Sequence, residues 1–395
     1  MLVKTENNRS YLAVCFTSFL LRVQWGIATS FLPIQISELG GSAVEVGLVF
    51  SVFAAIMVPS AFLWGRISDY VGKRKPFIVS AMFGLPVIFI LMTFQRDALP
   101  LLLVRACSAI CIAAFIPCAW ALVSDLSPPE TVGRNMGILG SFETAGFAVG
   151  PLLGGVIVQA LGFNVLWIIV AVICFAGGLI FLVTGADSTK SVKRASLVET
   201  ARTRAEKEKR TSKILVLYAA TAVCVVGGSF LGPNFNVYVV RTLGYSKELF
   251  GVISLIGMGA AALLQPISGS LCDKLGSKPI LITAGISIAL GNLVLLIGGE
   301  LQWIILSLIL MSLYSSYFMA ASAYVNAAVS PKEKSGALGI LNSMDSFGRA
   351  TASLAGGFVI LLADVPTAIR IGSAFPIIAV FIIFFAVKEP QLSRQ

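Results

Sequence analysis

Two carboxylates lie in the middle of apolar stretches, in two copies of one segment. Residues 137–155 read GILGSFETAGFAVGPLLGG and residues 339–357 read GILNSMDSFGRATASLAGG, at a constant offset of 202 residues. Glu143 is central in the first copy and Asp345 in the second. An acid inside an apolar helix is costly unless it is paired or faces water, so it indicates a functional site. Because the chain has no His, proton chemistry must use such carboxylates.

Three arginines accompany these acids inside apolar segments, at Arg22, Arg105 and Arg349. Arg349 follows Asp345 by four residues on one helix face, so a purely structural ion pair is one interpretation. Glu143 has no such local partner. It is the first candidate for the proton-binding group, with Asp345 second and Arg105 as the neighbouring charge that modulates coupling. The alternative is a static Glu143–Arg105 pair that only orders the helices.

Long apolar helices must position these residues. The chain of 395 residues is 57% hydrophobic and 12% charged, about half the charged fraction of a soluble domain. A spanning helix needs roughly 20 apolar residues, and lipid cannot satisfy open strand edges. The sequence predicts an all-α membrane protein with twelve transmembrane helices. They are expected at 11–36, 44–66, 76–95, 99–123, 135–160, 163–184, 213–240, 248–271, 279–298, 302–328, 337–362 and 367–387.

The net charge of +10 reflects membrane topology rather than nucleic-acid binding. Of the 29 Lys and Arg residues, 22 fall in segments on one side of the predicted membrane and four on the other. The positive-inside rule then predicts a multi-pass protein of the plasma membrane with both termini in the cytoplasm. All seven Cys lie in or at the ends of apolar segments, so no disulfide framework, metal site or cofactor is expected.

The duplication extends beyond the two acidic segments. ELGGSAVEVG at 38–47 matches TLGYSKELFG at 242–251, and GRISDYVGKRKP at 65–76 matches GSLCDKLGSKP at 269–279. Repeated halves with a solute site near the bilayer midplane are typical of secondary transporters. The predicted organisation is a six-helix half at 1–185, a basic cytoplasmic linker at 186–212 and a second six-helix half at 213–395.

This pattern resembles the major facilitator superfamily over the whole chain. The family's cytoplasmic loop motif is Gly-x-x-x-Asp-x-x-Gly followed by basic residues. The matching residues here are Gly65, Asp69, Gly72, Lys73 and Arg74, although Tyr70 stands where many members carry Arg. Asp69 can pair with Lys73 or Arg74, and Asp125, at the inner end of the fourth predicted helix, is a further partner in this cluster. The resemblance implies that the cluster latches the two halves while the cavity is open outward. The second copy would contribute Asp273 and Gly276.

The two glycines of the loop motif have physical roles that follow from the lack of a side chain. Gly65 is expected to let two helices approach closely, and Gly72 to permit a tight turn. A basic loop that only sets topology is the alternative interpretation of the motif.

A second motif resembles that of the drug:proton antiporters within the superfamily. It reads Gly146-x-x-x-Gly150-Pro151-x-x-Gly154-Gly155. Glycines at this spacing allow close helix contact, and Pro151 removes a helix hydrogen bond and allows a bend. The resemblance implies proton-coupled antiport, and ordinary glycine packing is the alternative.

A third, weaker match concerns one of the intramembrane arginines. Arg105 resembles an Arg that is usual in this family, but Ser108 and Ala109 replace the Gln and Gly that accompany it there.

The candidate solute site combines a cation with polar and aromatic residues. Arg22 could clamp a carboxylate or phosphate. The remaining substrate-binding candidates are Gln24, Trp25, Asn234, Asn236, Tyr238, Tyr317 and Arg349.

An enzyme is not expected, since neither a nucleophile–base arrangement nor a phosphate-binding loop is apparent. The predicted function is alternating-access transport of a small organic solute by a monomer, as proton-coupled antiport that exports amphipathic compounds. One alternative is a proton-coupled symporter or exchanger of an organic anion. Another is a membrane receptor that does not transport. The expected partners are a small-molecule substrate, protons and the lipid bilayer, with no nucleic acid.

Overall fold

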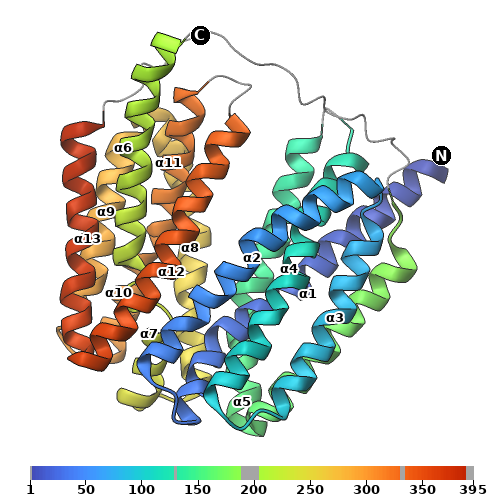
Figure 1. Ribbon diagram of the computed structural model, residues 1–395, viewed down its shortest axis with the longest axis horizontal. Helices are drawn as coiled ribbons and strands as arrows, with labels where there is room; N and C mark the ends of the chain where they lie inside the picture. The colour runs from blue at the N-terminus through green and yellow to red at the C-terminus, as the bar shows by residue number, and fades with distance from the viewer. Residues whose placement is uncertain (1, 129–130, 188–203, 330–333, 388–395) are drawn as a thin grey trace. The chain divides into compact units, whose positions relative to one another are not determined.

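A computed structural model of the chain describes residues 2–128, 131–187, 204–329 and 334–387, without the side chains at 2–8, 69, 133, 204–213, 273 and 334–336. The described residues form helices joined by short turns and no strand (Figure 1). The helices are α1 (Leu2–Glu38), α2 (Ala43–Val71), α3 (Lys75–Thr93), α4 (Ala98–Leu126), α5 (Val132–Thr184), α6 (Arg204–Gly228), α7 (Asn234–Val237), the π-helical η1 (Tyr238–Thr242), α8 (Lys247–Leu275), α9 (Ser277–Val294), α10 (Leu301–Ser312), α11 (Tyr314–Ala328), α12 (Lys334–Leu362) and α13 (Val365–Ala386).

The twelve predicted membrane spans are confirmed, although two of them lie in one helical element. α5 holds both the fifth and the sixth span, and the chain reverses at Gly162, whose φ of 80° favours glycine. The tenth span is interrupted at Leu313, where α10 ends and α11 begins. The seventh span consists of α6, α7 and η1. By length and apolar composition, nine described helical stretches qualify as spans, and Ile214–Gly228 is a shorter apolar helix.

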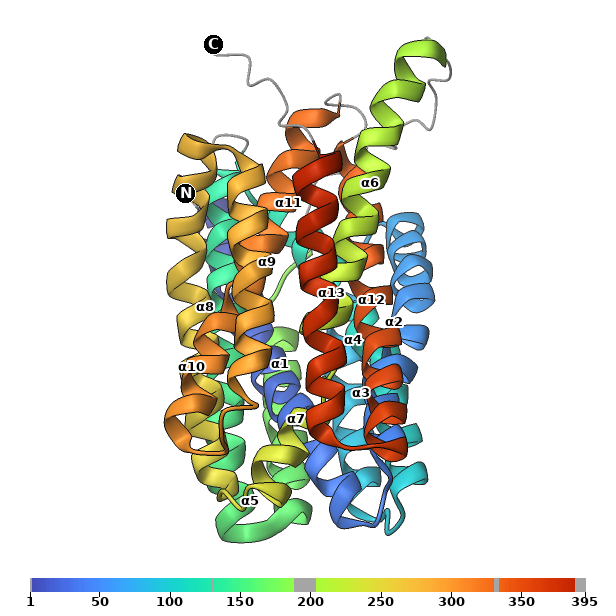
Figure 2. The ribbon, with the colours of Figure 1, turned by 90° about the vertical axis from the view of Figure 1, so that its left-hand side faces the viewer.

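The chain divides into two compact units. Unit 1 comprises Met1–Ser196 and Val240–Leu255, and unit 2 comprises Leu197–Val239 and Ile256–Gln395. In unit 1, α1 lies against α5 and α4, while α3 packs on α4 and α5 (Figure 1). In unit 2, α13 lies between α6 and α9, as Figure 2 also shows. Because Val240–Leu255 belongs to unit 1, the start of α8 packs with the first six spans. Its place in the sequence, in the second half of the chain, does not suggest this.

The sequence duplication appears as duplicated helix contacts. In unit 1 a Cβ at Gly146 of α5 would collide with the carbonyl oxygen of Phe19 on α1. In unit 2 a Cβ at Gly348 of α12 would lie 3.2 Å from the carbonyl oxygen of Ala222 on α6. The two glycines are 202 residues apart and the two carbonyl groups 203 apart. The same small residue therefore sets the same close helix contact in each unit.

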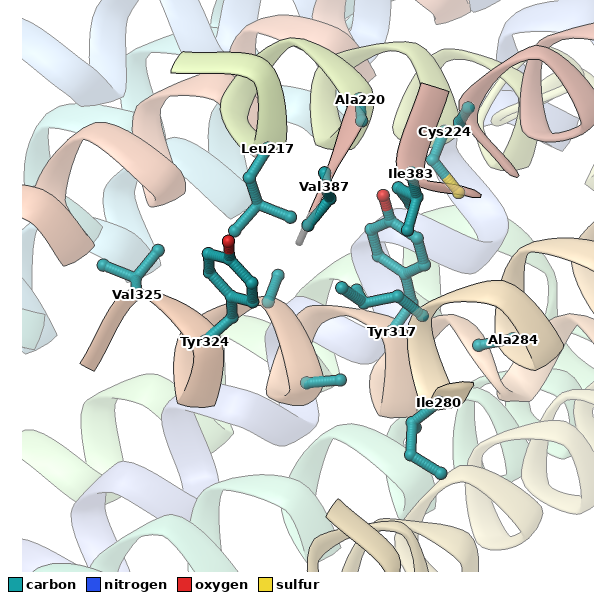
Figure 3. Packing of buried hydrophobic residues seen from close by; sticks show 14 of the residues in the cluster. Leu217, Ala220, Cys224, Ile280, Ala284, Tyr317, Tyr324, Val325, Ile383 and Val387 are labelled. Carbon is teal, nitrogen blue, oxygen red and sulfur yellow. The ribbon is translucent and has the colours of Figure 1, made fainter. Parts of the chain in front are cut away.

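The core of unit 2 is built around two tyrosines of α11. Tyr317 is fully buried and Tyr324 is 2% exposed. In Figure 3 both side chains point from α11 toward α6, where Leu217 and Cys224 lie. The aromatic rings fill the space between these helices, so this end of unit 2 is a packed interior.

Candidate functional site

Glu143 is held by side chains from two other helices of unit 1. Its carboxylate accepts a hydrogen bond from Arg22 Nη2 on α1 at 2.7 Å and one from Trp120 Nε1 on α4 at 3.1 Å. Glu143 is 6% exposed, whereas the side chain of Arg22 is 22% exposed. The ion pair neutralises a charge that would otherwise be isolated in an apolar helix. Proton binding at Glu143 would directly change the contact between α1 and α5.

Arg105 does not join this ion pair. Its guanidinium lies 5.0 Å from the ring centroid of Phe53 and 5.8 Å from that of Phe89. Arg105 is 4% exposed, and its Nη1 has no hydrogen-bond partner among the described residues. Cation–π attraction to the two rings compensates part of the cost of burial. The interpretation of a static Glu143–Arg105 pair is therefore wrong, because Arg22 is the residue that reaches Glu143.

A chain of aromatic contacts connects the two arginines. The Arg22 guanidinium lies 4.7 Å from the ring centroid of Trp25, and Trp25 packs against Phe53 at 5.8 Å between centroids. Phe53 in turn lies below Arg105. The two cations thus share an aromatic wall formed by α1 and α2, with the acid at one end of it.

The glycine motif of α5 forms two helix contacts at once. On the α1 side, a Cβ at Gly150 would lie 2.5 Å from the carbonyl oxygen of Val23. On the α8 side, a Cβ at Gly155 would lie 2.6 Å from the carbonyl oxygen of Lys247. Gly154 packs on the ring of Phe31, and Gly146 packs on α1 as described above. The predicted close contact of these glycines is present, and it also fixes the start of α8.

Pro151 supplies the reason for one further contact. A proline cannot donate to the carbonyl of the residue four positions earlier, which here is Phe147. A Cβ at Gly26 of α1 would lie 2.5 Å from that same carbonyl oxygen. The released carbonyl therefore faces the one α1 residue without a side chain. The backbone of α5 stays helical at Pro151, and the only non-helical residue inside α5 is Gly162.

Polar contacts surround the crossing of α5 and α8 within unit 1. Lys247 Nζ pairs with Glu38 Oε1 at 2.7 Å, and the Lys247 backbone N–H donates to Gln159 at 3.1 Å. Arg241 donates to the Ser37 carbonyl at 2.6 Å. These bonds join η1 and the start of α8 to the end of α1 and the end of the first span of α5. An ion pair at such a crossing can open and close with modest energy because it is partly exposed.

Unit 2 carries a second acid–arginine cluster. Arg349 Nε donates to Asp345 Oδ2 at 3.0 Å, and the Tyr314 hydroxyl donates to Asp345 Oδ1. The Arg349 guanidinium lies 4.5 Å from the Tyr314 ring centroid. The local pairing expected from the spacing is present. It differs from the Glu143 cluster because Val225 occupies the α6 position that corresponds to Arg22.

The remaining predicted substrate residues differ in exposure. Tyr317 lies fully buried in the packed core of unit 2, which does not fit the substrate-binding role predicted for it. Gln24 is also fully buried, and neither atom of its amide has a partner in the described residues. Asn234 is 5% exposed at the start of α7, whereas Asn236 and Tyr238 are half-buried.

The loop motif is described in part. Gly72 ends α2 with a φ of 70°, and Gly276 precedes α9 with a φ of 89°, so both form the expected turns. Arg74 Nε lies 3.9 Å from Asp125 Oδ2, and Lys73 is exposed. The side chains of the predicted latch residues Asp69 and Asp273 lie outside the described residues.

Gly65 does not make the close helix contact expected of it. A Cβ at this position would meet no heavy atom within 4 Å in the part of the chain that the structure describes. Open space around Gly65 removes the steric reason for a glycine in this structure.

Sequence reasoning missed two residues that contact predicted ones. Trp120 donates a hydrogen bond to Glu143, and the sequence around Trp120 carries no signal of this role. Asp187 accepts hydrogen bonds from the backbone N–H groups of Arg74 and Lys75, each at 2.7 Å, and so caps α3 from the end of unit 1's sixth span. An acid directly after an apolar span, near a basic loop in the predicted topology, is the signal that could have found it.

Two repeated six-helix sequences that each hold an acid–arginine pair inside apolar helices define a membrane transporter built from two halves. The family model described as Major Facilitator Superfamily matches residues 14–235 and 217–395, and the chain belongs to this superfamily. It is accordingly an integral, multi-pass transporter of small molecules and not an enzyme.

Similar proteins include two that are named for multidrug resistance. The chain is 25% identical over 375 residues to "Multidrug resistance protein MdtG" of Proteus mirabilis (strain HI4320), covering 91% of this chain and 92% of that protein. It is 27% identical over 281 residues to "Multi-drug resistance efflux pump PmrA" of Streptococcus pneumoniae, covering 68% of each.

Solved structures share the fold at low sequence identity. The nucleoside transporter NupG (D323A mutant) superposes with a TM-score of 0.82 at 14% identity, covering 96% of this chain and 100% of that one. The human organic anion transporter MFSD10 superposes with a TM-score of 0.68 at 17% identity, covering 95% and 99%. These likenesses support the fold alone.

Proposed function

We propose that this protein is a proton-coupled antiporter that exports amphipathic organic compounds across the plasma membrane by alternating access. The glycine motif of α5 and the similarity to proteins named for multidrug resistance support this function. The single observation that carries it is the Glu143 cluster, a buried acid whose charge is balanced by a cation from another helix.

Glu143 binds the transported proton in this mechanism. When the carboxylate takes up a proton, the ionic part of its contact with Arg22 is lost, while Arg22 remains charged. The guanidinium can then interact more strongly with Trp25, whose ring centroid lies 4.7 Å away. When the proton leaves, the ion pair forms again and draws α1 onto α5. Protonation therefore biases a conformational equilibrium through a contact that differs between the two states.

The glycine contacts let this change move helices rather than single side chains. α5 touches α1 through Gly150 and the start of α8 through Gly155. Tightly packed small residues transmit displacement because no side chain between the helices can absorb it. The Lys247–Glu38 pair is the bond that breaks when the α8 segment separates from α1.

The proposed function also includes an orientation in the membrane and an oligomeric state. The strong excess of basic residues on one side supports cytoplasmic termini in the plasma membrane. We propose a monomer, because each predicted site residue belongs to a single chain with its own repeated halves. The loop at Gly72–Arg74, with Asp125 beside Arg74, is proposed as the cytoplasmic latch.

The decisive experiment follows proton flux in energised everted membrane vesicles. A ΔpH-sensitive dye is recorded while lipophilic cations, neutral amphipaths and organic acids are added in turn. Wild type should release protons from the vesicle lumen with at least one class, and Glu143→Gln should abolish the release. Glu300→Gln serves as the matched control, since it neutralises an exposed acid outside both clusters. Full proton release by Glu143→Gln would contradict the assignment of Glu143, and no release by wild type with any class would contradict antiport.

A further inference from the structure

Arg349 leaves the terminal edge of its guanidinium unused. Asp345 bonds only to Nε, and the ring of Tyr314 covers one face. The two terminal amino groups make no hydrogen bond to the described residues, and the side chain is 45% exposed. Arg22 differs, because its terminal Nη2 is already bonded to Glu143 and its side chain is 22% exposed.

The sequence of α12 shows which medium Arg349 faces. Asn342, Asp345, Ser346 and Arg349 recur at the spacing of one helix face. Three large apolar side chains of α12 are also exposed, and they fall on the opposite side of the helix. They are Ile340, Phe347 and Phe358.

This division separates the lipid-facing and water-facing sides of α12. Large apolar side chains with 47% to 65% exposure suit contact with acyl chains. A charged stripe on the other face is stable only beside water or a polar partner. The exposed edge of Arg349 therefore points into an aqueous space and not into the bilayer.

The surroundings of Arg349 also fix its orientation. The Tyr314 hydroxyl holds Oδ1 of Asp345, so the carboxylate presents Oδ2 to the Nε side of the guanidinium. The Tyr314 ring stacks on the same guanidinium. The planar fork of the guanidinium is thus held in place while the Arg349 side chain stays 45% exposed. Such a fork matches the two oxygens of a carboxylate or phosphonate.

We propose that Arg349 is the subsite for the acidic group of the transported compound, which makes the substrate class amphipathic organic anions. This inference rests on the proposed transport function and specifies its cargo. Asp345 and Tyr314 act as positioning residues for the arginine. Glu143 and Arg22, in the other unit, retain the proton-binding role.

The test measures binding of naphthylacetate and of its uncharged amide to the purified full-length protein in detergent by isothermal titration. Wild type should bind the acid at least about tenfold more tightly than the amide, since a charge-assisted hydrogen bond contributes about 1.5–3 kcal/mol. Arg349→Gln should remove this difference and leave binding of the amide unchanged. Arg349→Lys should restore part of it, because a lysine keeps the charge without the planar fork. Arg370→Gln is the matched control, an exposed arginine of α13 outside the cluster.

Each outcome decides the proposal. Equal binding of acid and amide by wild type would overturn it, as would an unchanged preference in Arg349→Gln. An equal loss of both ligands in Arg349→Gln would indicate a structural role and also overturn it. Selective acid binding without proton flux in vesicles would support the anion subsite while contradicting the proposed antiport, so the two failures are distinguishable.

Discussion

At the scale of single residues, the two intramembrane acids are stabilised differently. Glu143 takes its cation from another helix, whereas Asp345 takes it from the next turn of its own helix. An ion pair between helices responds to helix movement, and one within a helix does not. This contrast is the physical reason for placing the proton at Glu143 and a recognition role at Arg349.

Removal of one partner from the buried pair should be worse than removal of both. Arg22→Gln leaves the Glu143 carboxylate buried without its cation, which costs about 3–5 kcal/mol of stability. The double variant Arg22→Gln/Glu143→Gln leaves two neutral amides that can bond to each other, and it should unfold at a higher temperature than Arg22→Gln alone. Thermal unfolding of the purified proteins measures this. If the double variant is the less stable of the two, the pair is not coupled.

At the scale of helices, the contacts of α5 are set by residues without side chains. Gly150→Leu would place a Cβ 2.5 Å from the Val23 carbonyl, where backbone cannot yield, so α1 and α5 must separate. Overpacking of this kind costs about 1–3 kcal/mol or more. We expect a lower unfolding temperature and loss of transport.

The matched control lies on the same helix. A Cβ at Gly137 meets nothing within 4 Å, and alanine favours helix more than glycine does. Gly137→Ala should therefore unfold at the same temperature or slightly higher. Equal damage from both glycine variants would mean that general helix propensity, and not the contact with α1, governs α5.

The cap that Asp187 provides for α3 gives a prediction at the same scale. Asp187→Ala removes the acceptor for the N–H groups of Arg74 and Lys75, which should cost about 1 kcal/mol. Asp187→Asn keeps an acceptor oxygen and should cost less. Chemical unfolding of α3, followed by hydrogen exchange at its first turn, distinguishes the two. Identical exchange in Asp187→Ala and wild type would contradict the cap.

An exposed cap in unit 2 predicts a dependence on pH. The Asp364 side chain accepts from the Thr367 N–H at the start of α13, and these hydrogen bonds hold the pKa of Asp364 below its usual value of 3.8. Its folded pKa is depressed, so the cap contributes above the unfolded pKa and is lost as the pH falls through the folded pKa. Asp364→Ala should remove this acid-dependent part of the stability, measured as unfolding temperature between neutral and strongly acidic pH. An unchanged pH profile would count against it.

At the scale of the whole molecule, orientation in the membrane is the property to test. With basic residues concentrated in the predicted cytoplasmic segments, both termini should lie in the cytoplasm. A fluorescent-protein fusion at the C-terminus should glow, and an alkaline-phosphatase fusion there should be inactive. A phosphatase fusion in the turn after α1, at Gly40–Gly41, should be active. The reverse pattern would invert the proposed topology and the direction of transport.

Much of this organisation follows from the sequence alone. The twelve spans are predictable because bilayer thickness fixes the length of each apolar segment. The repeat at an offset of 202 residues predicts matched helix contacts, which Gly146 and Gly348 make. Turn residues such as Gly72 are also legible, since a left-handed backbone favours glycine. These features depend on local composition and spacing.

Only the tertiary structure decided which side chains from different helices contact each other. From the sequence, Arg105 was the partner considered for Glu143, and Arg22 was assigned to the solute. Arg22 is the partner because Gly146, three residues after Glu143, lets α5 pack closely on α1 at this point: a Cβ at Gly146 would lie 3.1 Å from the Arg22 Cβ. Arg105 instead lies against Phe53. Helix rotation about its own axis decides such contacts, and a sequence specifies it only through the packing of all neighbours at once.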